Sequence, residues 1–464
     1  MFRGKVQRVH FVGIGGSGMS GIAEVLLTQG YTVTGSDMKE GQAVRRLRRL
    51  GGTIYIGHDP GHVAGAHVVV KSTAVPPTNP EIVAAEAAQI PVIPRAEMLA
   101  ELMRMKYGLA VAGTHGKTTT TSMLATCMHG AGLDPTIVIG GRLDSMGSSA
   151  RLGAGEFLVA EADESDGSFM LLDPTVAVIT NIDPEHLEHW GSMDHLVDGF
   201  CAFANKVPFF GFATLCLDHP VVQSLLPRIR RRTVTYGFNA QADVRGENLV
   251  LEGISARVDV RWRGQPMGTV QLNMPGQHNV SNALAAIAVG LELDIPFEEL
   301  ARALDGFSGV ERRFSVRGEV DLGDGPPVTI IDDYGHHPTE IRATLEAAAN
   351  AWTGRRIVAV FQPHRFTRVR DLFDDFVRCF NHATAVVVCP VYRAGEAPIE
   401  GIDHHSLGSG MIEHGHRGVA VVESLDEATR LLASSTQAGD IIITLGAGDV
   451  NRVCTELQAA LDGQ

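Results

Sequence analysis

The chain has 464 residues, of which 53 are acidic and 39 are lysine or arginine, so its formal net charge is −14 at pH 7. This length exceeds what one hydrophobic core organises, and two to four domains are expected. The negative balance argues against a nucleic-acid partner and against an anionic membrane surface. It does not argue against anionic ligands, which local cationic groups can hold.

Cysteine usage and apolar run length indicate the cellular compartment. The six cysteines are scattered and include no C-x-x-C pair, as expected for reduced, buried thiols. No apolar run approaches the ~20 residues needed to span a bilayer, and residues 9–12 already resemble a first strand rather than part of a signal peptide. We therefore expect a soluble, cytoplasmic protein.

The N-terminal region, residues 1–106, begins with a β-α-β pattern. A strand at 9–12, a glycine turn at 13–18 and a helix at 19–29 precede a second strand that runs to Asp37. Glycines in such a turn let a diphosphate approach the backbone, and the acidic residue can hold ribose hydroxyls. The pattern leaves open a dinucleotide cofactor, another nucleotide-linked ligand or no ligand, and it favours the second.

A second β-α-β pattern follows in the same region. Its strands at 53–57 and 67–70 lead to Ser72, and a helix at 79–88 and a strand at 91–94 come next. Ser72 would lie at the carboxyl edge of the sheet, where ligands collect in such folds.

The central region opens with a strand–turn–helix. The strand at 109–112 is followed by Gly113-Thr114-His115-Gly116, and the helix begins with Lys117-Thr118-Thr119. Backbone N–H groups at such a helix start attract phosphate, Lys117 adds a positive charge, and Thr118 offers a hydroxyl to Mg²⁺. The usual P-loop has a glycine where Val111 stands, so an ordinary strand–turn–helix corner is the alternative.

Two further strand ends in this region are rich in possible metal ligands. The strand at 157–160 runs into Glu161-Ala162-Asp163-Glu164-Ser165-Asp166, where four carboxylates surround a cation or form a solvated acidic loop. The strand at 175–180 leads to His186 and His189. Their spacing permits zinc, but the neighbouring oxygen ligands and the phosphate site favour magnesium.

Later motifs have both local and ligand-binding interpretations. Asn282 precedes an alanine-rich helix at 283–293, and its spacing favours a helix cap. Arg313 belongs to a solvated hinge or contacts a nucleotide.

In the C-terminal region, Arg365 and Arg368 either hold a carboxylate or phosphate in bidentate fashion or begin a basic surface helix. Strands at 328–332, 356–361, 383–389, 419–422 and 441–445 alternate with helices and predict a doubly wound sheet.

Seven motifs occur in a fixed order: GTHGKTT, EADESD, NIDPEH, PGQHNVSNA, ERRF, DDYGHHP and QPHRFTR. Together they resemble the Mur ligase family, the ATP-dependent amide-bond ligases of peptidoglycan precursor synthesis. GIGGSGMSGIA, GSD and KSTAV near the N-terminus resemble the branch of the family that adds L-alanine.

The resemblance implies an α/β protein of three domains. Residues 1–106 would form a Rossmann-like domain that binds a UDP-sugar. Residues 107–314 would form a P-loop domain with a mainly parallel sheet that binds ATP. Residues 315–464 would form a second Rossmann-like domain that binds the amino acid and part of the nucleotide.

The implied reaction joins L-alanine to the lactyl carboxylate of UDP-N-acetylmuramate. The carboxylate attacks the γ-phosphate of ATP, an acyl phosphate forms, and the amine of alanine displaces phosphate with Mg²⁺ as cofactor. A monomer or homodimer with no nucleic-acid or membrane partner is expected. The alternatives are a murein-peptide recycling ligase that joins a tripeptide, an NAD(P)-dependent dehydrogenase, and a nucleotide-binding module without catalysis.

The resemblance also assigns residues to each site. The ATP-binding residues would be Gly113, Thr114, His115, Gly116, Lys117, Thr118, Thr119, Asn282, Arg313 and Asp333. The UDP-sugar would be bound by Gly15, Gly16, Ser17, Gly18, Asp37 and Ser72. The metal ligands would be Thr118, Glu164 and His186. The catalytic residues would be Lys117, Glu164, His186 and Arg365, with His336 and Arg365 at the acceptor substrate.

One feature of the family pattern is missing from this sequence. Several relatives carry a carbamylated lysine about fifteen residues after the histidine that matches His186, whereas here that position falls near Cys201 and residues 187–205 contain no lysine. The alanine-adding branch is expected to lack this lysine. The general base that deprotonates the alanine ammonium is not identifiable from the sequence.

Overall fold

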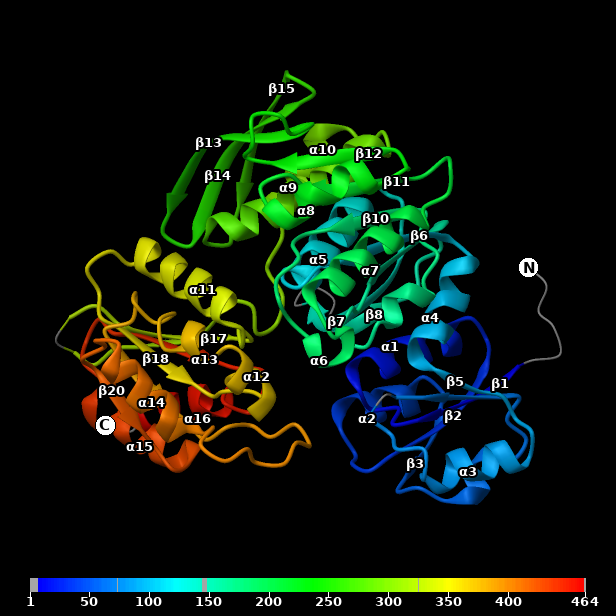
Figure 1. Cartoon of the computed structure of the whole chain (residues 1–464), viewed down its shortest axis with the longest axis horizontal. Helices are drawn as coiled ribbons and strands as arrows, with labels where there is room; N and C mark the ends of the chain where they lie inside the picture. The colour runs from blue at the N-terminus through cyan, green and yellow to red at the C-terminus, as the bar shows by residue number, and fades with distance from the viewer. Residues whose placement is uncertain (1–6, 73, 144–147, 324, 463–464) are drawn as a thin grey trace. The chain divides into compact units, whose positions relative to one another are not determined.

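The computed structural model describes residues 7–72, 74–143, 148–323 and 325–462, and three β-sheets organise it (Figure 1). The chain divides into two compact units. The first comprises Met1–Asn248, Val258–Gln271 and Ser281–Ser308, and the second comprises Leu249–Arg257, Leu272–Val280 and Gly309–Gln464.

The first sheet is parallel, with strand order β3-β2-β1-β4-β5. Its central strand β1 is buried from Val9 to Val12, as expected for a parallel strand covered on both faces. Both predicted β-α-β patterns are present. The elements are β1 (Arg8–Val12), α1 (Ser17–Thr28), β2 (Thr32–Asp37), α2 (Gln42–Arg49), β3 (Thr53–Ile56), η1 (Pro60–Val63), β4 (Val68–Lys71), α3 (Pro80–Ala87), β5 (Val92–Pro94) and α4 (Arg95–Arg104).

The second sheet has ten strands in the order β15-β14-β13-β12-β11-β10-β6-β9-β7-β8. Its strands from β12 to β7 are parallel, and β8 is antiparallel to β7. The elements are β6 (Tyr107–Ala112), α5 (Lys117–Gly130), β7 (Thr136–Leu143), β8 (Ser148–Arg151), β9 (Phe157–Glu161), η2 (Ser168–Leu171), β10 (Val176–Ile179), α6 (Leu187–Trp190), α7 (Met193–Asn205), β11 (Phe212–Cys216), α8 (Pro220–Leu225), η3 (Leu226–Arg228), β12 (Thr233–Gly237), β13 (Val244–Glu252), β14 (Ser255–Trp262), β15 (Gln265–Leu272), α9 (Gln277–Glu292) and α10 (Phe297–Asp305).

The register of this sheet brings three strand ends together. Val111 of β6 pairs with Glu161 of β9, and Ala112 of β6 pairs with Ile179 of β10. Because the strands are parallel and in step, the segments that follow them leave the same edge of the sheet side by side. Val111 lies inside β6 and is fully buried, so the turn begins only at Gly113 and has no place for an earlier glycine.

The third sheet has the order β16-β17-β21-β18-β19-β20 and is parallel apart from the antiparallel pair β16/β17. Strands β17 and β21 are buried along their whole length, as in a doubly wound fold. The elements are β16 (Ser315–Val320), β17 (Val328–Asp333), α11 (Pro338–Ala351), β18 (Ile357–Phe361), α12 (Phe366–Asp371), α13 (Phe373–Phe376), β19 (Ala385–Val388), α14 (His404–Glu413), β20 (Val419–Val421), α15 (Leu425–Ser435), β21 (Ile441–Leu445) and α16 (Arg452–Asp462).

One expectation about a helix start is wrong. Helix α9 begins at Gln277, so Asn282 lies in its second turn and is not a cap. Gly276, with φ +89°, turns the chain just before the helix. Val280 and Ala283 are both buried, so the apolar face of the helix already begins before residue 283, where the helix was predicted to start. Asn282 is itself buried.

The cysteines behave as predicted, since all six are buried and none forms a disulfide. Over the described parts of the chain, no helix combines the length and apolar character that crossing a bilayer requires.

Candidate functional site

The turn after β6 needs glycine at two positions. A Cβ on Gly113, whose φ is +137°, would lie 2.0 Å from Oγ1 of Thr180. A Cβ on Gly116, whose φ is +79°, would lie 2.6 Å from Oδ1 of Asn282. The sequence-predicted Asn282 therefore lies directly against the turn, and the absence of side chains on both glycines keeps the backbone accessible.

Lys117 is held by the turn and by the neighbouring strand end. Its Nζ donates to the carbonyl oxygens of Gly113 (2.5 Å) and Thr114 (3.0 Å) and to Oε1 of Glu164 (2.8 Å). Burial alone would lower the pKa of Lys117, but the carboxylates of Glu164, Asp163 and Glu185 together outweigh that effect and the pKa is raised. Thr118 and Thr119 follow in the first turn of α5 and are buried.

Glu164 does not belong to a solvated acidic loop. Only 2% of this residue is exposed, and burial raises the pKa of its carboxyl to about 7 even though Lys117 acts in the opposite direction. Its Oε2 is buried and has no hydrogen-bond partner within the described chain. Trp190 Nε1 donates to the Glu164 carbonyl at 2.9 Å and fixes the backbone.

A hard cation fits this constellation. A buried oxygen without a partner is costly unless something satisfies it, and carboxylate and hydroxyl oxygens are the donors that Mg²⁺ prefers. Thr118, Glu164 and His186 are the residues that would hold it.

His186 adopts a strained backbone conformation. Its φ is +55°, which is uncommon for a residue other than glycine and concentrates at functional sites. It precedes α6, with Nδ1 3.6 Å from Glu188 and Nε2 3.8 Å from Glu185. His189 instead packs against Gly167 and the edge of the Trp190 ring, so the zinc interpretation of the two histidines gains no support.

Two residues after β10 complete the site and were missed in the sequence. Asn181 accepts a hydrogen bond from the His115 N–H (2.7 Å) and donates to the His115 carbonyl (3.0 Å). Asp183 lies between His115 Nε2 (3.3 Å) and His219 Nε2 (3.4 Å). Burial by itself would raise the pKa of Asp183, but the two histidines lower it below the usual range. The feature of the sequence that could have identified Asn181 and Asp183 is their position just after a buried strand.

The glycine loop after β1 closes on the end of β2. The N–H groups of Gly13 and Ile14 donate to the Ser36 carbonyl (2.9 and 3.0 Å), and the Gly15 N–H donates to Asp37 Oδ2 (2.8 Å). Ser72 lies on the other side, with its Cβ 3.3 Å from the place where a Gly13 Cβ would be. Gly16 and Gly18 flank Ser17, the first residue of α1.

A buried carboxylate supports this loop. Glu81, which is fully buried in α3, accepts a hydrogen bond from the Ser36 hydroxyl (2.5 Å) and contacts His58 (3.0 Å), His62 (2.6 Å) and His10 (3.7 Å). Burial alone would raise the pKa of Glu81, but these partners lower it to about 2. No sequence pattern predicts this cluster, because its members are far apart in the chain.

Arg95 connects the glycine loop to the acidic strand end. A Cβ on Gly18 would lie 2.9 Å from Arg95 Nη1, and Arg95 Nη2 is 3.5 Å from Asp163 Oδ2. The two predicted ligand sites of the first unit are therefore neighbours. The sequence signal was an arginine directly after β5, which was overlooked.

In the second unit, residues just before β16 and at the end of β17 form one cluster. Asp333 is buried and accepts hydrogen bonds from the N–H groups of Gly335 (2.7 Å) and Phe314 (2.8 Å). Burial raises the pKa of the Asp333 carboxyl. The guanidinium of Arg313 lies over the Tyr334 ring at 5.1 Å, and its Nη1 is 3.7 Å from Glu340.

The motif after β18 lies beside this cluster. The ring of His364 is 5.8 Å from that of His336 and stacks on Tyr392. Arg365 has a φ of +69° and immediately precedes α12, and its N–H donates to the Tyr392 carbonyl at 2.9 Å. Arg368 turns back onto His364, so of the two arginines only Arg365 lies at the strained position.

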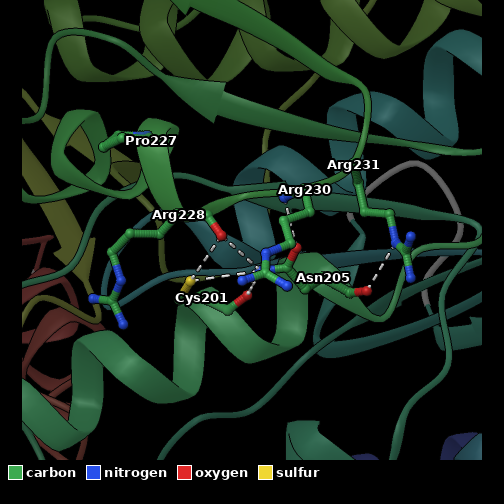
Figure 2. Close-up of a pocket in the computed structure, with 6 residues that line it drawn as sticks. All are labelled: Cys201, Asn205, Pro227, Arg228, Arg230 and Arg231. Carbon is green, nitrogen blue, oxygen red and sulfur yellow. Dashed lines mark hydrogen bonds between the residues drawn. The ribbon is translucent and has the colours of Figure 1, made fainter.

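A separate pocket of about 720 Å³ is lined by Cys201, Asn205, Pro227, Arg228, Arg230 and Arg231 (Figure 2). Cys201 Sγ donates to the Arg228 carbonyl at 3.8 Å, and Asn205 contacts the same sulfur at 3.6 Å. These contacts tie α7 to η3. Cys201, near which the family pattern would place a lysine, therefore has a packing role here.

The fold and the site together define a three-domain α/β protein with a phosphate-type turn in its central sheet. Three family models match the chain: the catalytic domain of the Mur ligase family at residues 8–107, the Mur ligase middle domain at 111–290 and the glutamate ligase domain of Mur ligases at 312–448. The chain belongs to the Mur ligase family, and the resemblance seen in the sequence is confirmed. Members of this family are ATP-dependent ligases.

Individual relatives agree with this assignment. The chain is 54% identical over 450 residues to the UDP-N-acetylmuramate–L-alanine ligase of Geobacter sp. (strain M21), covering 97% of this chain and 96% of the relative. The crystal structure of UDP-N-acetylmuramate–alanine ligase from Thermotoga maritima superposes with a TM-score of 0.83 at 30% identity, covering 98% and 99%. A murein peptide ligase from Psychrobacter arcticus superposes with a TM-score of 0.71 at 24% identity, covering 99% of both chains, which shows the shared fold.

Proposed function

We propose that this chain joins L-alanine to the lactyl carboxylate of UDP-N-acetylmuramate, with hydrolysis of ATP to ADP and phosphate. The geometric observation that supports it best is the meeting of three strand ends, which places Lys117 against Glu164 beside the segment of His186. Relatives that share more than half of their residues with the chain over almost its full length carry this activity in their names.

The reaction requires an anionic carboxylate to approach an anionic phosphate. Lys117 would bind the β- and γ-phosphates and reduce this repulsion, and the N–H groups at the start of α5 would orient them. Mg²⁺, held by Thr118, Glu164 and His186, would supply further charge neutralisation at the phosphates. The other turn residues, Gly113, Thr114, His115, Gly116 and Thr119, would enclose the phosphates together with Asn282.

The remaining predicted residues would bind the other parts of the substrates. Gly15, Gly16, Ser17, Gly18, Asp37 and Ser72 would bind the UDP-sugar, and Arg95 would keep this site next to the acidic strand end. Arg313 and Asp333 would bind the adenosine, and His336 and Arg365 would serve the acceptor. The three domains would be residues 1–106, 107–314 and 315–464. The protein would be cytoplasmic and would act on small molecules.

A murein-peptide recycling ligase is the alternative within the family. The solved murein peptide ligase from Psychrobacter arcticus is 24% identical to the chain, whereas the solved alanine ligase from Thermotoga maritima is 30% identical and the curated alanine ligases from Geobacter and Geotalea species are 52–54% identical. The alanine-adding activity is therefore the better supported of the two.

A coupled assay of ADP release tests the proposal. With ATP, Mg²⁺ and UDP-N-acetylmuramate present, we expect release to depend on L-alanine and to be slower with serine or glycine. A methyl group contributes only ~1–3 kcal/mol of discrimination, so some activity with glycine is expected. Release that depends on a tripeptide and not on alanine would identify the recycling ligase instead. Thermal stabilisation by NADH but not by UDP-N-acetylmuramate would favour a dehydrogenase.

A further inference from the structure

Helix α14 begins with two adjacent histidines that face a glutamate from the end of another element. His404 and His405 open the helix, and Glu423 lies two residues beyond β20 (Figure 1). His405 Nε2 is 3.0 Å from Glu423 Oε1, and His404 Nε2 is 3.6 Å from Glu423 Oε2. Ligand atoms of all three residues lie within 4.8 Å of one another.

The distances suit a small divalent ion. Two ligand atoms bound at about 2.0–2.1 Å in a tetrahedral arrangement are separated by about 3.3 Å, and the two observed separations lie on either side of that value. Imidazole with one carboxylate is a donor set typical of zinc, whereas Mg²⁺ prefers oxygen ligands. The side chain of His405 is exposed, so its ring can rotate to bring Nε2 within bonding distance of the ion.

A second observation points to a missing partner. In the part of the chain that the structure describes, His404 Nε2 is buried and has no hydrogen-bond partner. A buried polar atom in this state is costly unless a ligand satisfies it. The carboxylate of Glu423 lies 3.6 Å from this atom.

The framework that holds the three residues is firm. Asp403 caps α14 by accepting from the Ser406 N–H (2.7 Å), and the Ser406 hydroxyl accepts from the Asp403 N–H (3.0 Å). A Cβ on Gly408 would lie 2.4 Å from Cγ2 of Val421, so the helix packs closely on β20. Because Asp403 is used as the cap, Glu423 is the carboxylate available to an ion.

We infer that His404, His405 and Glu423 form a Zn²⁺ site with three protein ligands and a fourth position for water. The ion would join the start of α14 to the end of β20. It is separate from the proposed Mg²⁺ site, whose residues belong to the other unit of the chain. The alternative is a simple ion pair between His405 and Glu423. Such a pair would not require His404 and would bind no metal.

Titration calorimetry on the full chain, stripped of metal with a chelator, tests this site with ZnCl₂ as the probe. We expect one Zn²⁺ per chain at this site, and a titration with MgCl₂ should show no binding there. His405→Asn and Glu423→Gln should each weaken Zn²⁺ binding at least tenfold, since even the loss of an outer-shell partner weakens metal binding by about 10–100-fold. Both residues are exposed, so both variants should fold, and circular dichroism without zinc checks this.

His414→Asn is the matched control. His414 ends the same helix, and its Nδ1 lies 2.8 Å from the Gly410 carbonyl, away from the cluster. Zinc affinity should be unchanged in this variant. Zinc binding that survives both His405→Asn and Glu423→Gln, or no zinc binding by the unmodified chain, would overturn the inference.

Discussion

Lys117 donates from Nζ to Oε1 of Glu164 across 2.8 Å, and this contact joins the phosphate-type turn to the end of the neighbouring strand. The two residues are 47 positions apart and meet only because β6 and β9 are paired in parallel. If ATP binds as proposed, its phosphates would share the ammonium group with Glu164, and this contact would hold Lys117 close to the transferred phosphate.

Lys117→Ala should abolish ADP release and leave the fold intact. The loss of a charge aimed at the transferred phosphate is expected to lower kcat by at least about 100- to 1,000-fold. Glu164 would tolerate the loss of its partner because burial already raises the pKa of its carboxyl to about 7, so it can become neutral. Coupled ADP release and a thermal melt measure the two effects.

Lys206→Ala provides the comparison for this variant. Lys206 also pairs with a carboxylate, Asp173 at 2.9 Å, but it follows α7 and is not in the turn. Its substitution should leave kcat unchanged. Normal turnover in Lys117→Ala would show that the turn does not bind the transferred phosphate.

Gly116→Ala should abolish ATP binding through a steric conflict. Its Cβ would lie 2.6 Å from Asn282 Oδ1, so the turn or α9 would have to move. Gly132→Ala carries the same strain from a positive φ, +73° against +79°, but its Cβ would meet nothing within 4 Å. Equilibrium binding of a nonhydrolysable ATP analogue should be lost only in the first variant. Equal affinities in the two variants would mean that the Asn282 contact has no role.

Local patterns predicted most of the fold and only part of the site. Lys117 and Glu164 were singled out because the turns that follow buried strands can be recognised in the sequence, whereas Asp333, the last residue of β17, was assigned only by resemblance. Glu81 and Arg95 were missed because their importance comes from partners that only the folded chain brings near. Asn282 was found by resemblance, while its spacing alone suggested a cap, because helical periodicity does not mark where α9 begins.

Substitution of two neighbouring arginines in the second unit should have different effects: Arg312→Ala should lower stability, and Arg313→Ala should lower activity. Arg312 donates to the carbonyls of Gly446 (2.6 Å) and Gly448 (3.0 Å) and lies 3.3 Å from the buried Asp332. Loss of these charged hydrogen bonds in Arg312→Ala should cost about 2–4 kcal/mol and lower Tm by roughly 5 °C or more. Differential scanning fluorimetry measures this change.

Arg313→Ala should show the opposite pattern. Its ion pair with Glu340 is long, at 3.7 Å, so the Tm should change little. If Arg313 contacts the nucleotide as proposed, the KM for ATP should rise at least tenfold. A lower Tm with an unchanged KM would make Arg313 a structural residue.

Glu81→Gln should destabilise the chain in a pH-dependent way. The pKa of Glu81 is about 2 in the folded protein and 4.5 ordinarily, which corresponds to roughly 3 kcal/mol of stability at neutral pH. Because the folded-state pKa is the lower one, this contribution is complete above about pH 4.5 and is lost as the pH falls toward 2. The difference in urea unfolding midpoint between the two proteins should therefore be large at pH 7 and shrink below pH 4.5.

Glu86→Gln is the control for this series, because Glu86 lies on the same helix but is exposed. Its unfolding midpoint should follow that of the unmodified chain at every pH. Since Ser36 links Glu81 to the glycine loop, Glu81→Gln should also raise the KM for UDP-N-acetylmuramate and leave that for ATP unchanged. A midpoint difference that stays constant from pH 7 to pH 3 would show that Glu81 acts through packing and not through its charge.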